Sequence, residues 1–156
     1  MQFSIGRNPD APAPPPSTAG GTVTARGVGV AINSNRDIII ARQMGRELAA
    51  ELGFSGTDLT LIATAISELA RNIVLYAKSG EIVLTPIQEG KKTGIAVVAI
   101  DKGPGIPDIR RALADGFSTS RSLGLGLPGV RRLMDEFEIT SEVNCGTTVT
   151  VRQWAL

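Results

Sequence analysis

The sequence predicts an α+β fold, a two-layer α/β sandwich in which helices cover one face of a mixed, mostly antiparallel sheet. Two observations favour this class. The β-rich segments come in neighbouring pairs joined by short polar turns, which is typical of antiparallel hairpins. Before and between these pairs lie long segments whose apolar residues recur with helical periodicity. An antiparallel sheet packs one face on helices, and 156 residues, 42% of them apolar, suffice for one such domain.

The chain is predicted to divide into a proline-rich leader, residues 1–21, and one folded domain, residues 22–156. Five of the nine prolines lie in the leader, which ends in Gly20 and Gly21. Proline fixes its backbone and lacks an N–H donor, so the leader is expected to be disordered or polyproline-like. It could serve as a plain tail or as a polyproline ligand for a partner.

The folded domain is predicted to begin with a strand and a helix. Apolar and small residues alternate over residues 28–32, which indicates a strand. Ser34 or Asn35 can cap a helix that runs to about Leu52, where Gly53 ends it.

A second helix and a hairpin follow. The helix is predicted from a cap at Thr57 to about Lys78, before Gly80. The β-rich runs Glu81–Thr85 and Gly94–Ile100 are joined by a polar, glycine-containing turn and predict a hairpin.

The last third of the domain is predicted to contain a helix and a second hairpin. The helix runs from about Leu127 to Phe137, after a glycine-rich stretch. The strands are predicted at Glu138–Val143 and Thr147–Trp154, joined by a turn at residues 144–146.

Composition excludes several classes of function. The chain has no histidine, so a Ser-His-Asp triad, a Cys-His pair, His-ligated zinc and a phosphohistidine carrier are excluded within it. Its single cysteine, Cys145, forms no intrachain disulfide and is expected to be a small packed residue. Lys and Arg number 16 against 15 Asp and Glu, which argues against nucleic-acid binding.

No segment predicts a membrane partner or secretion. The longest purely apolar runs, such as Ile95–Ile100, are too short to span a bilayer, and no secretory leader is visible. The cysteine usage fits a reducing compartment, so we expect a cytoplasmic protein.

The second helix carries a polar pair on an otherwise apolar surface. Glu68 and Asn72 lie one turn apart, and a carboxylate and an amide oxygen there suit a general base and a ligand of a hard cation such as Mg²⁺. A surface pairing role is the alternative for this pair alone. The main apolar stripe comprises Leu59, Ile62, Ala63, Ile66, Leu69, Ala70, Ile73, Val74 and Ala77, and the second seam comprises Leu61, Ala65, Glu68, Asn72 and Leu75.

A second candidate segment, Asp101–Pro107, follows the apolar strand directly. Its sequence, DKGPGIP, places a carboxylate at the end of a strand and then Gly103 and Gly105. Glycines let a flat ligand approach the backbone, and the Asp101 carboxylate can accept a hydrogen bond from an exocyclic amine such as that of adenine. A tight Pro-Gly turn with Asp101 as a turn residue is the alternative.

A third candidate lies where the helix near residue 127 begins. Gly124 and Gly126 would expose backbone N–H groups at the positive end of the helix dipole, which suits phosphate. No G-K-[ST] follows, so this is not a P-loop. The small, polar segment 115–122 is expected to close over a ligand, or to be an ordinary surface loop. Near the last strand, a hydroxyl of Thr147 or Thr148 could contact a base edge through water.

The ordered set of motifs resembles the Bergerat ATP-binding fold of the GHKL superfamily. The set is E-x-x-x-N on a helix, D-x-G-x-G after a strand, G-x-G at a later helix and G-T before the last strand. The short chain does not fit the larger members, and the missing histidine does not fit a complete histidine kinase. The chain is therefore similar to the small anti-sigma regulatory serine kinases.

Within that class the chain resembles the RsbT-type switch kinases of the stressosome, from about Val30 to Trp154. The resemblance is carried by residues 65–73, 101–109, 115–120 and 123–137. It implies that ATP with Mg²⁺ phosphorylates a serine or threonine of a STAS-domain antagonist, of the RsbS or RsbR kind. It also implies that the freed kinase binds and activates a PP2C-type phosphatase, of the RsbU kind.

The resemblance implies roles at the phosphate end of the site. Glu68 corresponds to the general base that takes the substrate proton, and Asn72 to the Mg²⁺ ligand. Gly124 and Gly126 correspond to the phosphate-binding box.

The resemblance also implies roles at the adenine end. Asp101 corresponds to the carboxylate that recognises adenine, and Gly103 and Gly105 allow the base to approach. Thr147 corresponds to the threonine that contacts adenine through water, with Thr148 as the alternative.

Two other functions are considered beside the switch kinase. An RsbW-type anti-sigma factor would share the fold and the kinase chemistry but would sequester a sigma factor; the sequence around Asn72 favours the RsbT type. In a binding module, ATP would only set the conformation and phosphatase activation would be the output. The intact Glu68 favours an enzyme. Arg71 and Arg121 are close enough in sequence to contact phosphate or a partner.

Overall fold

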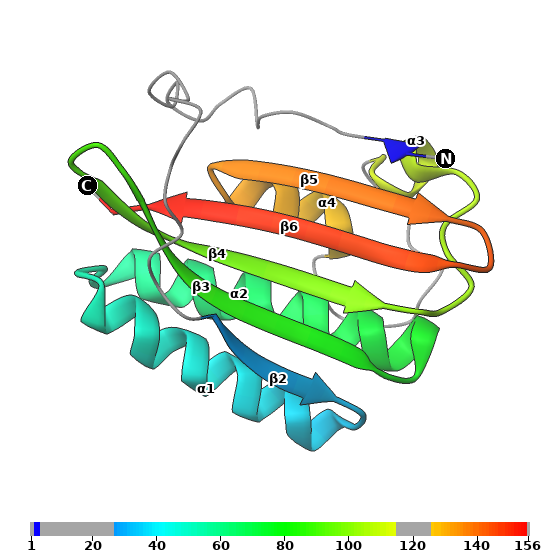
Figure 1. Ribbon diagram of the computed structural model, residues 1–156, viewed down its shortest axis with the longest axis horizontal. Coiled ribbons are helices and arrows are strands. Elements are labelled where there is room, and N and C mark those ends of the chain that lie inside the picture. The colour runs from blue at the N-terminus through cyan, green and yellow to red at the C-terminus, as the bar shows by residue number, and fades with distance from the viewer. Residues whose placement is uncertain (1, 4–26, 115–125, 156) are drawn as a thin grey trace.

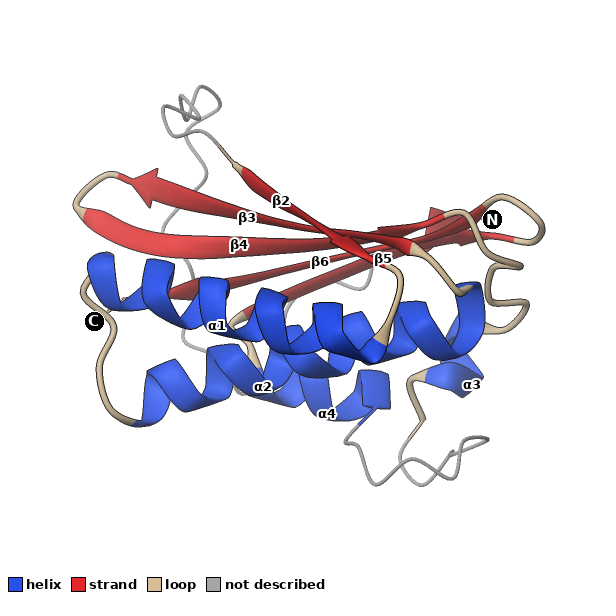
Figure 2. Ribbon diagram, turned by 90° about the horizontal axis from the view of Figure 1, so that it is seen from below, coloured by secondary structure: helices blue, strands red, loops and turns tan. Residues whose placement is uncertain are grey.

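The computed structural model describes residues 2–3, 27–114 and 126–155, and these form a sheet covered by helices on one face (Figures 1 and 2). The sheet has six strands in the order β1-β5-β6-β4-β3-β2, and every neighbouring pair is antiparallel. The predicted α+β sandwich is confirmed. The strands are β1 Gln2–Phe3, β2 Val28–Ile32, β3 Gly80–Glu89, β4 Lys92–Asp101, β5 Glu136–Glu142 and β6 Gly146–Trp154; the helices are α1 Asn35–Glu51, α2 Thr57–Asn72, η1 Ile73–Ala77, α3 Ile109–Ala112 and α4 Gly126–Leu133.

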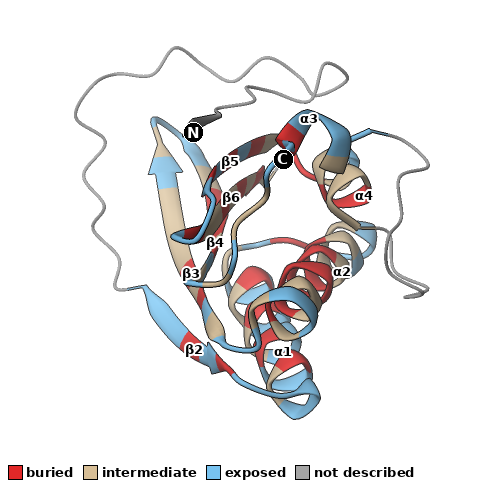
Figure 3. Ribbon diagram, turned by 90° about the vertical axis from the view of Figure 1, so that its right-hand side faces the viewer, coloured by how far each residue is buried: buried red, intermediate tan, exposed pale blue. Residues whose placement is uncertain are grey.

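The core lies between the sheet and the helix layer. Alternate strand residues point toward the helices, and Figure 3 shows that the buried positions gather on the surfaces where the two layers meet. The fully enclosed aliphatic and aromatic side chains from both layers include Ile32, Ile62, Ile66, Leu69, Ile82, Leu84, Ile95, Val97, Phe137 and Ile139.

Helix α1 has the bounds that its sequence predicts. At its start, the Asp37 carboxylate accepts hydrogen bonds from the backbone N–H groups of Asn33 and Ser34, at 2.8 and 3.1 Å. These bonds satisfy donors that precede the helix. At its end, Gly53 takes a φ of +96°, which a glycine adopts without strain. Gly45 lets α1 lie close to Ile66 of α2.

Helix α2 differs from the prediction in its N-cap and in the form of its last turn. Its N-cap is Gly56, with a φ of +52°, and Thr57 is the first helical residue rather than the cap. After Asn72 the helix continues as one wide π-helical turn, η1, to Ala77. Such turns occur often at functional sites.

Helix α2 and η1 together form an apolar helix of 21 residues, Thr57–Ala77. Within the described part of the chain this is the one helix long and apolar enough to cross a bilayer. In the structure 44% of its most apolar window is buried, as expected of a helix that packs between a sheet and other helices.

The third predicted helix is shorter than expected. Helix α4 ends at Leu133, and Phe137 lies on β5 with its side chain in the core, so its assignment to the helix was wrong. The helical spacing of apolar residues extends to Phe137 in the sequence because that side chain also faces the core, although it does so from the sheet. The short helix α3, Ile109–Ala112, was not predicted.

Polar contacts explain why the chain leaves α4 before Phe137. The Asp135 N–H donates to the Gln153 side-chain oxygen at 2.8 Å, and the Asp135 carboxylate accepts from the Trp154 N–H at 2.9 Å. These bonds tie the chain to the end of β6 and start β5. Burial raises the pKa of the Asp135 carboxyl above its ordinary value, although the bond from Trp154 opposes that shift.

Both predicted hairpins are present, β3–β4 and β5–β6. Cys145 is exposed in the turn between β5 and β6, so the expectation of a packed cysteine is wrong: this residue lies at the tip of a turn, outside the core. Of the predicted leader, Gln2–Phe3 forms β1 beside β5, and the rest of residues 1–21 lies outside the described residues.

Candidate active site

One end of the sheet gathers most of the residues that the sequence singled out. Figure 1 shows the end of β4, the β5–β6 turn and the end of α2 at the same side of the molecule. An ideal Cβ built on Gly103 would lie 2.6 Å from the Cβ of Ala77, so the loop after β4 contacts η1 directly.

The Asp101 carboxylate organises the loop after β4. One of its oxygens, Oδ1, accepts hydrogen bonds from the Gly103 N–H at 2.9 Å and from the Thr147 N–H at 3.3 Å. No described group is bonded to the other oxygen, Oδ2. Asp101 can therefore hold its own loop and β6 with one oxygen while it offers the second to a ligand donor.

Two glycines allow the close approach of backbone segments around Asp101. Gly105 has a φ of +76° and lies against the Glu142 carbonyl, and Gly146 has a φ of +109° and lies against the Asp101 carbonyl. A side chain at either position would be strained and would meet backbone atoms. Gly105 was expected to admit a ligand, whereas here it admits the backbone at Glu142, and Gly146 was noted only as the start of the G-T motif.

The sheet separates Thr147 from Thr148. Thr147 pairs with Asp101 across the β4–β6 ladder and shares its face, because successive residues of a strand alternate. Thr148 pairs with the exposed Ile100 and points to the opposite face. Only Thr147 lies beside Asp101.

The buried Ser141 hydroxyl makes hydrogen bonds to both β6 and the loop after β4. It lies 2.8 Å from the Thr147 Oγ1 and 3.2 Å from the Gly146 carbonyl oxygen, and it accepts a hydrogen bond from the Ile106 N–H at 2.8 Å. Nothing in the sequence alone selects Ser141, because one serine in a strand is ordinary until its neighbours are known.

Replacing Asp101 with asparagine is expected to weaken ATP binding by about tenfold or more. Asparagine keeps the oxygen that accepts from the backbone, but presents an NH₂ group where an adenine amine would donate. Loss of a charge-assisted bond costs about 1.5–3 kcal/mol. Calorimetric titration with ATP measures the effect, with a thermal melt to check the fold. Wild-type affinity would contradict the adenine contact.

The two threonines offer a matched pair of variants. Thr147→Val keeps the shape and removes the hydroxyl beside Ser141, and we expect ATP affinity to fall about twofold to tenfold. Thr148→Val removes a hydroxyl from the other face and should leave affinity unchanged. Equal effects in the same titration would contradict the assignment of Thr147.

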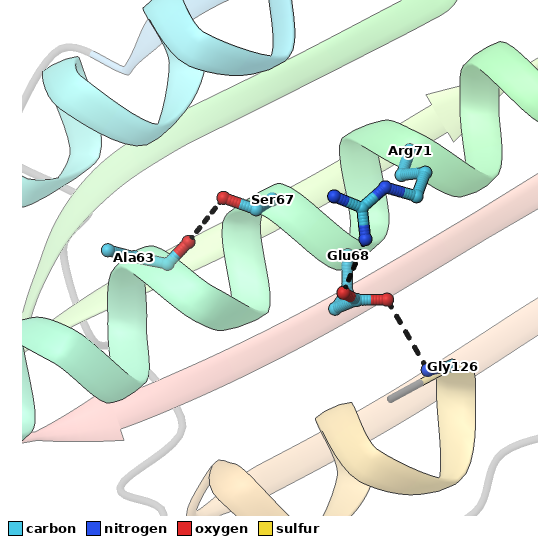
Figure 4. A network of polar contacts seen from close by, with 5 residues as sticks. All are labelled: Ala63, Ser67, Glu68, Arg71 and Gly126. Carbon is cyan, nitrogen blue, oxygen red and sulfur yellow. Dashed lines mark hydrogen bonds and ion pairs between the residues drawn. The ribbon is translucent and has the colours of Figure 1, made fainter. Parts of the chain in front are cut away.

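Glu68 lies deeper in the helix layer, where α2 meets α4. Glu68 is 6% exposed, and both oxygens of its carboxylate have partners (Figure 4). Oε1 lies 2.8 Å from a guanidinium nitrogen of Arg71, and Oε2 accepts from the Gly126 N–H at 3.3 Å. The structure therefore brings the predicted base to the predicted phosphate-binding turn.

Along the helix, Asn72 lies between Glu68 and the turn η1, which contacts the loop after Asp101. It ends α2 one turn after Glu68 and directly precedes η1, whose Ala77 contacts Gly103. Its half-buried side chain has no hydrogen-bond partner within the described ranges. Gly124, Arg121 and the predicted closing segment 115–122 lie outside the described residues.

An open groove between α1 and α2 leads to Glu68. The sequence did not predict it, because it requires the packing of two helices. Two of its hydroxyls are bonded to their own helix, Thr64 to the Thr60 carbonyl at 2.8 Å and Ser67 to the Ala63 carbonyl at 2.9 Å. Its lining consists of Arg42, Arg46, Thr60, Ala63, Thr64, Ser67 and Glu68.

Comparison with known proteins shows the family of this chain. Residues 57–155 match the family described as "Histidine kinase-, DNA gyrase B-, and HSP90-like ATPase". Serine/threonine-protein kinase RsbT of Bacillus subtilis (strain 168) is 53% identical over 125 residues, which cover 80% of this chain and 94% of that protein. The chain belongs to the RsbT family of serine/threonine-protein kinases.

Other known proteins are similar to this chain at lower identity. An anti-sigma F factor of Geobacillus stearothermophilus is 32% identical over 120 residues, 72% of this chain and 81% of that protein. The catalytic domain of the histidine kinase ThkA has a TM-score of 0.49 at 18% identity, over 81% of this chain and 95% of that one. Like its family, the RsbT-type chain has the GHKL ATPase fold and uses ATP.

Proposed function

We propose that this RsbT-type kinase phosphorylates a serine or threonine of a STAS-domain antagonist in the cytoplasm, with ATP and Mg²⁺, and then binds and activates a PP2C-type phosphatase. Residues 22–156 form the kinase domain, and residues 1–21 form a leader, of which Gln2–Phe3 pairs with β5 of that domain. One observation carries the proposal: the Glu68 carboxylate lies between the N-terminus of α4 and an open groove on the protein surface.

The position of Glu68 suits a general base in phosphoryl transfer. The substrate hydroxyl enters along the groove and attacks the γ-phosphorus of ATP, and the bond from that phosphorus to the β–γ bridging oxygen breaks. ADP leaves with the bridging oxygen, and the hydroxyl proton goes to a Glu68 carboxylate oxygen. Among the residues that the structure describes, no other carboxylate lines this groove.

The two halves of the site hold the two ends of the nucleotide. Asp101 accepts from the adenine amine and Thr147 contacts the base through water, while Gly103 and Gly105 let the loop after Asp101 pack against Ala77 and Glu142. At the other end the Gly126 N–H, together with Gly124, holds phosphate oxygens at the positive end of α4.

Asn72 is suited to Mg²⁺. Its amide oxygen is a hard ligand without a competing hydrogen bond among the described residues, one turn from Glu68. The described residues contain no cluster of three or more acidic, Cys or His side chains that could hold a metal without the nucleotide. The ion would therefore be held by Asn72 and phosphate oxygens, and would offset charge on the phosphates.

The groove also indicates how a protein substrate is recognised. Arg42 and Arg46 are exposed along it and supply positive charge beside the path to Glu68. They complement an acidic surface around the phosphorylated residue of the STAS partner.

The test is a transfer assay with labelled ATP. The purified chain is incubated with STAS-domain proteins encoded near its gene, and with Glu68→Gln as the inactive control. We expect a label on serine or threonine of one STAS protein, and stimulation of a co-encoded PP2C-type phosphatase by the unphosphorylated kinase. Capture of a sigma factor without STAS labelling would instead favour the anti-sigma function, which the relatives at about 30% identity make the second candidate.

A further inference from the structure

Both oxygens of the Glu68 carboxylate are held by groups of the kinds that bind phosphate in other proteins. One partner is the Arg71 guanidinium at 2.8 Å, and the other is the Gly126 N–H, at 3.3 Å, at the start of α4 (Figure 4). Guanidinium groups and helix N-termini are the usual protein partners of phosphate oxygens. The carboxylate thus occupies the place between two phosphate-binding groups.

Arg71 is the more exposed partner of the ion pair with Glu68. Its side chain is 38% exposed, whereas that of Glu68 is 8% exposed, and it reaches Glu68 across a single turn of α2. A guanidinium can bind phosphate through two parallel hydrogen bonds. A phosphate at the start of α4 would therefore lie one carboxylate's width from the guanidinium and would compete with Glu68 for both partners.

We propose that Arg71 is a further catalytic residue, whose guanidinium passes from Glu68 to the terminal phosphate of ATP as that phosphate replaces Glu68 at the Gly126 N–H. The exchange frees the Glu68 carboxylate, which already lines the groove, to accept the hydroxyl proton, so the base becomes available only beside a bound triphosphate. Arg71 then stabilises negative charge on the phosphoryl group during its transfer to the hydroxyl. The proposal rests on the proposed function for the role of Glu68 as base.

Nucleotide affinity tests the exchange without any protein substrate. ATP and ADP are titrated separately into the full chain, and the ratio of their affinities isolates the terminal phosphate. Arg71→Ala should lower ATP affinity about tenfold or more and ADP affinity much less. Arg71→Lys keeps the charge but not the planar fork, and should retain part of the preference for ATP.

Two further variants test the competition with Glu68 and control for the loss of a positive charge. Glu68→Gln removes the competing charge from Arg71 and Gly126, and should tighten ATP binding severalfold. Arg152→Ala removes one positive charge from the opposite face of the sheet, where Arg152 pairs with Glu138 at 3.6 Å, and should leave the ATP-to-ADP ratio unchanged.

Three results would overturn the proposal. They are equal losses of ATP and ADP affinity in Arg71→Ala, no loss of either, and weaker ATP binding in Glu68→Gln. The first would indicate a general effect of charge, and the second a clamp that only positions Glu68. Because these titrations contain no STAS protein, failure of the transfer assay leaves them interpretable, and their failure leaves STAS phosphorylation standing.

Discussion

Replacement of Glu68 with glutamine is expected to slow phosphoryl transfer to the STAS partner by about 10²–10⁴-fold, the usual contribution of a positioned base. Glutamine keeps the size of the side chain and its bond from the Gly126 N–H, but does not take up a proton at neutral pH. Transfer depends strongly on positioning and on charge around the phosphates, so we expect the lower part of that range. Single-turnover transfer at saturating ATP measures it.

A control variant separates the base from general effects of charge. Glu51→Gln removes one carboxylate from the exposed end of α1 and should transfer at the wild-type rate. Phosphatase activation by Glu68→Gln should persist if it depends on binding alone. Wild-type transfer by Glu68→Gln would mean that another group accepts the proton.

Gly146→Ala is expected to lower the free energy of unfolding by about 2–5 kcal/mol and to abolish most nucleotide binding. The φ of +109° costs a residue with a side chain about 1–2 kcal/mol, and an added Cβ would press on the Asp101 carbonyl, a contact that costs about 1–3 kcal/mol more. The strand would have to move away from Asp101, which would disturb the bond from the Thr147 N–H. Urea unfolding and ATP titration measure the two effects.

Gly53→Ala provides the matched comparison. Gly53 also has a positive φ, +96°, but a Cβ there would meet no atom within 4 Å. Its loss should be limited to the backbone cost of about 1–2 kcal/mol, with unchanged ATP affinity. Equal losses in the two variants would show that the contact with Asp101 does not matter.

The parts of the fold that local chemistry determines could be predicted from the sequence. Helix α1 begins and ends as expected because Asp37 and Gly53 act within one turn of its ends. The hairpins were predicted because each turn and its strands are contiguous. The hydrogen bond from the Gly103 N–H to Asp101, at 2.9 Å, spans two residues and fits the alternative of Asp101 as a turn residue.

Features that depend on contacts between distant segments could not be predicted. The choice between Thr147 and Thr148 needs the register of β6 against β4, which places Thr147 opposite Asp101. Ser141 matters only because β5, β6 and the loop after β4 meet around it. The end of α4 was misjudged because Phe137 suits a helix and a strand equally, and its contacts favour the strand.

The wide turn η1 changes the angular phase of the helix that carries the site. One extra residue in a turn rotates all later residues by about 100° relative to a regular continuation. As a result, Glu68, before the turn, faces α4, and Ala77, after the turn, faces the loop at Gly103. Loss or gain of a single residue between them would rotate one end of the nucleotide site about the helix axis relative to the other end. This segment should therefore tolerate substitutions far better than changes in length.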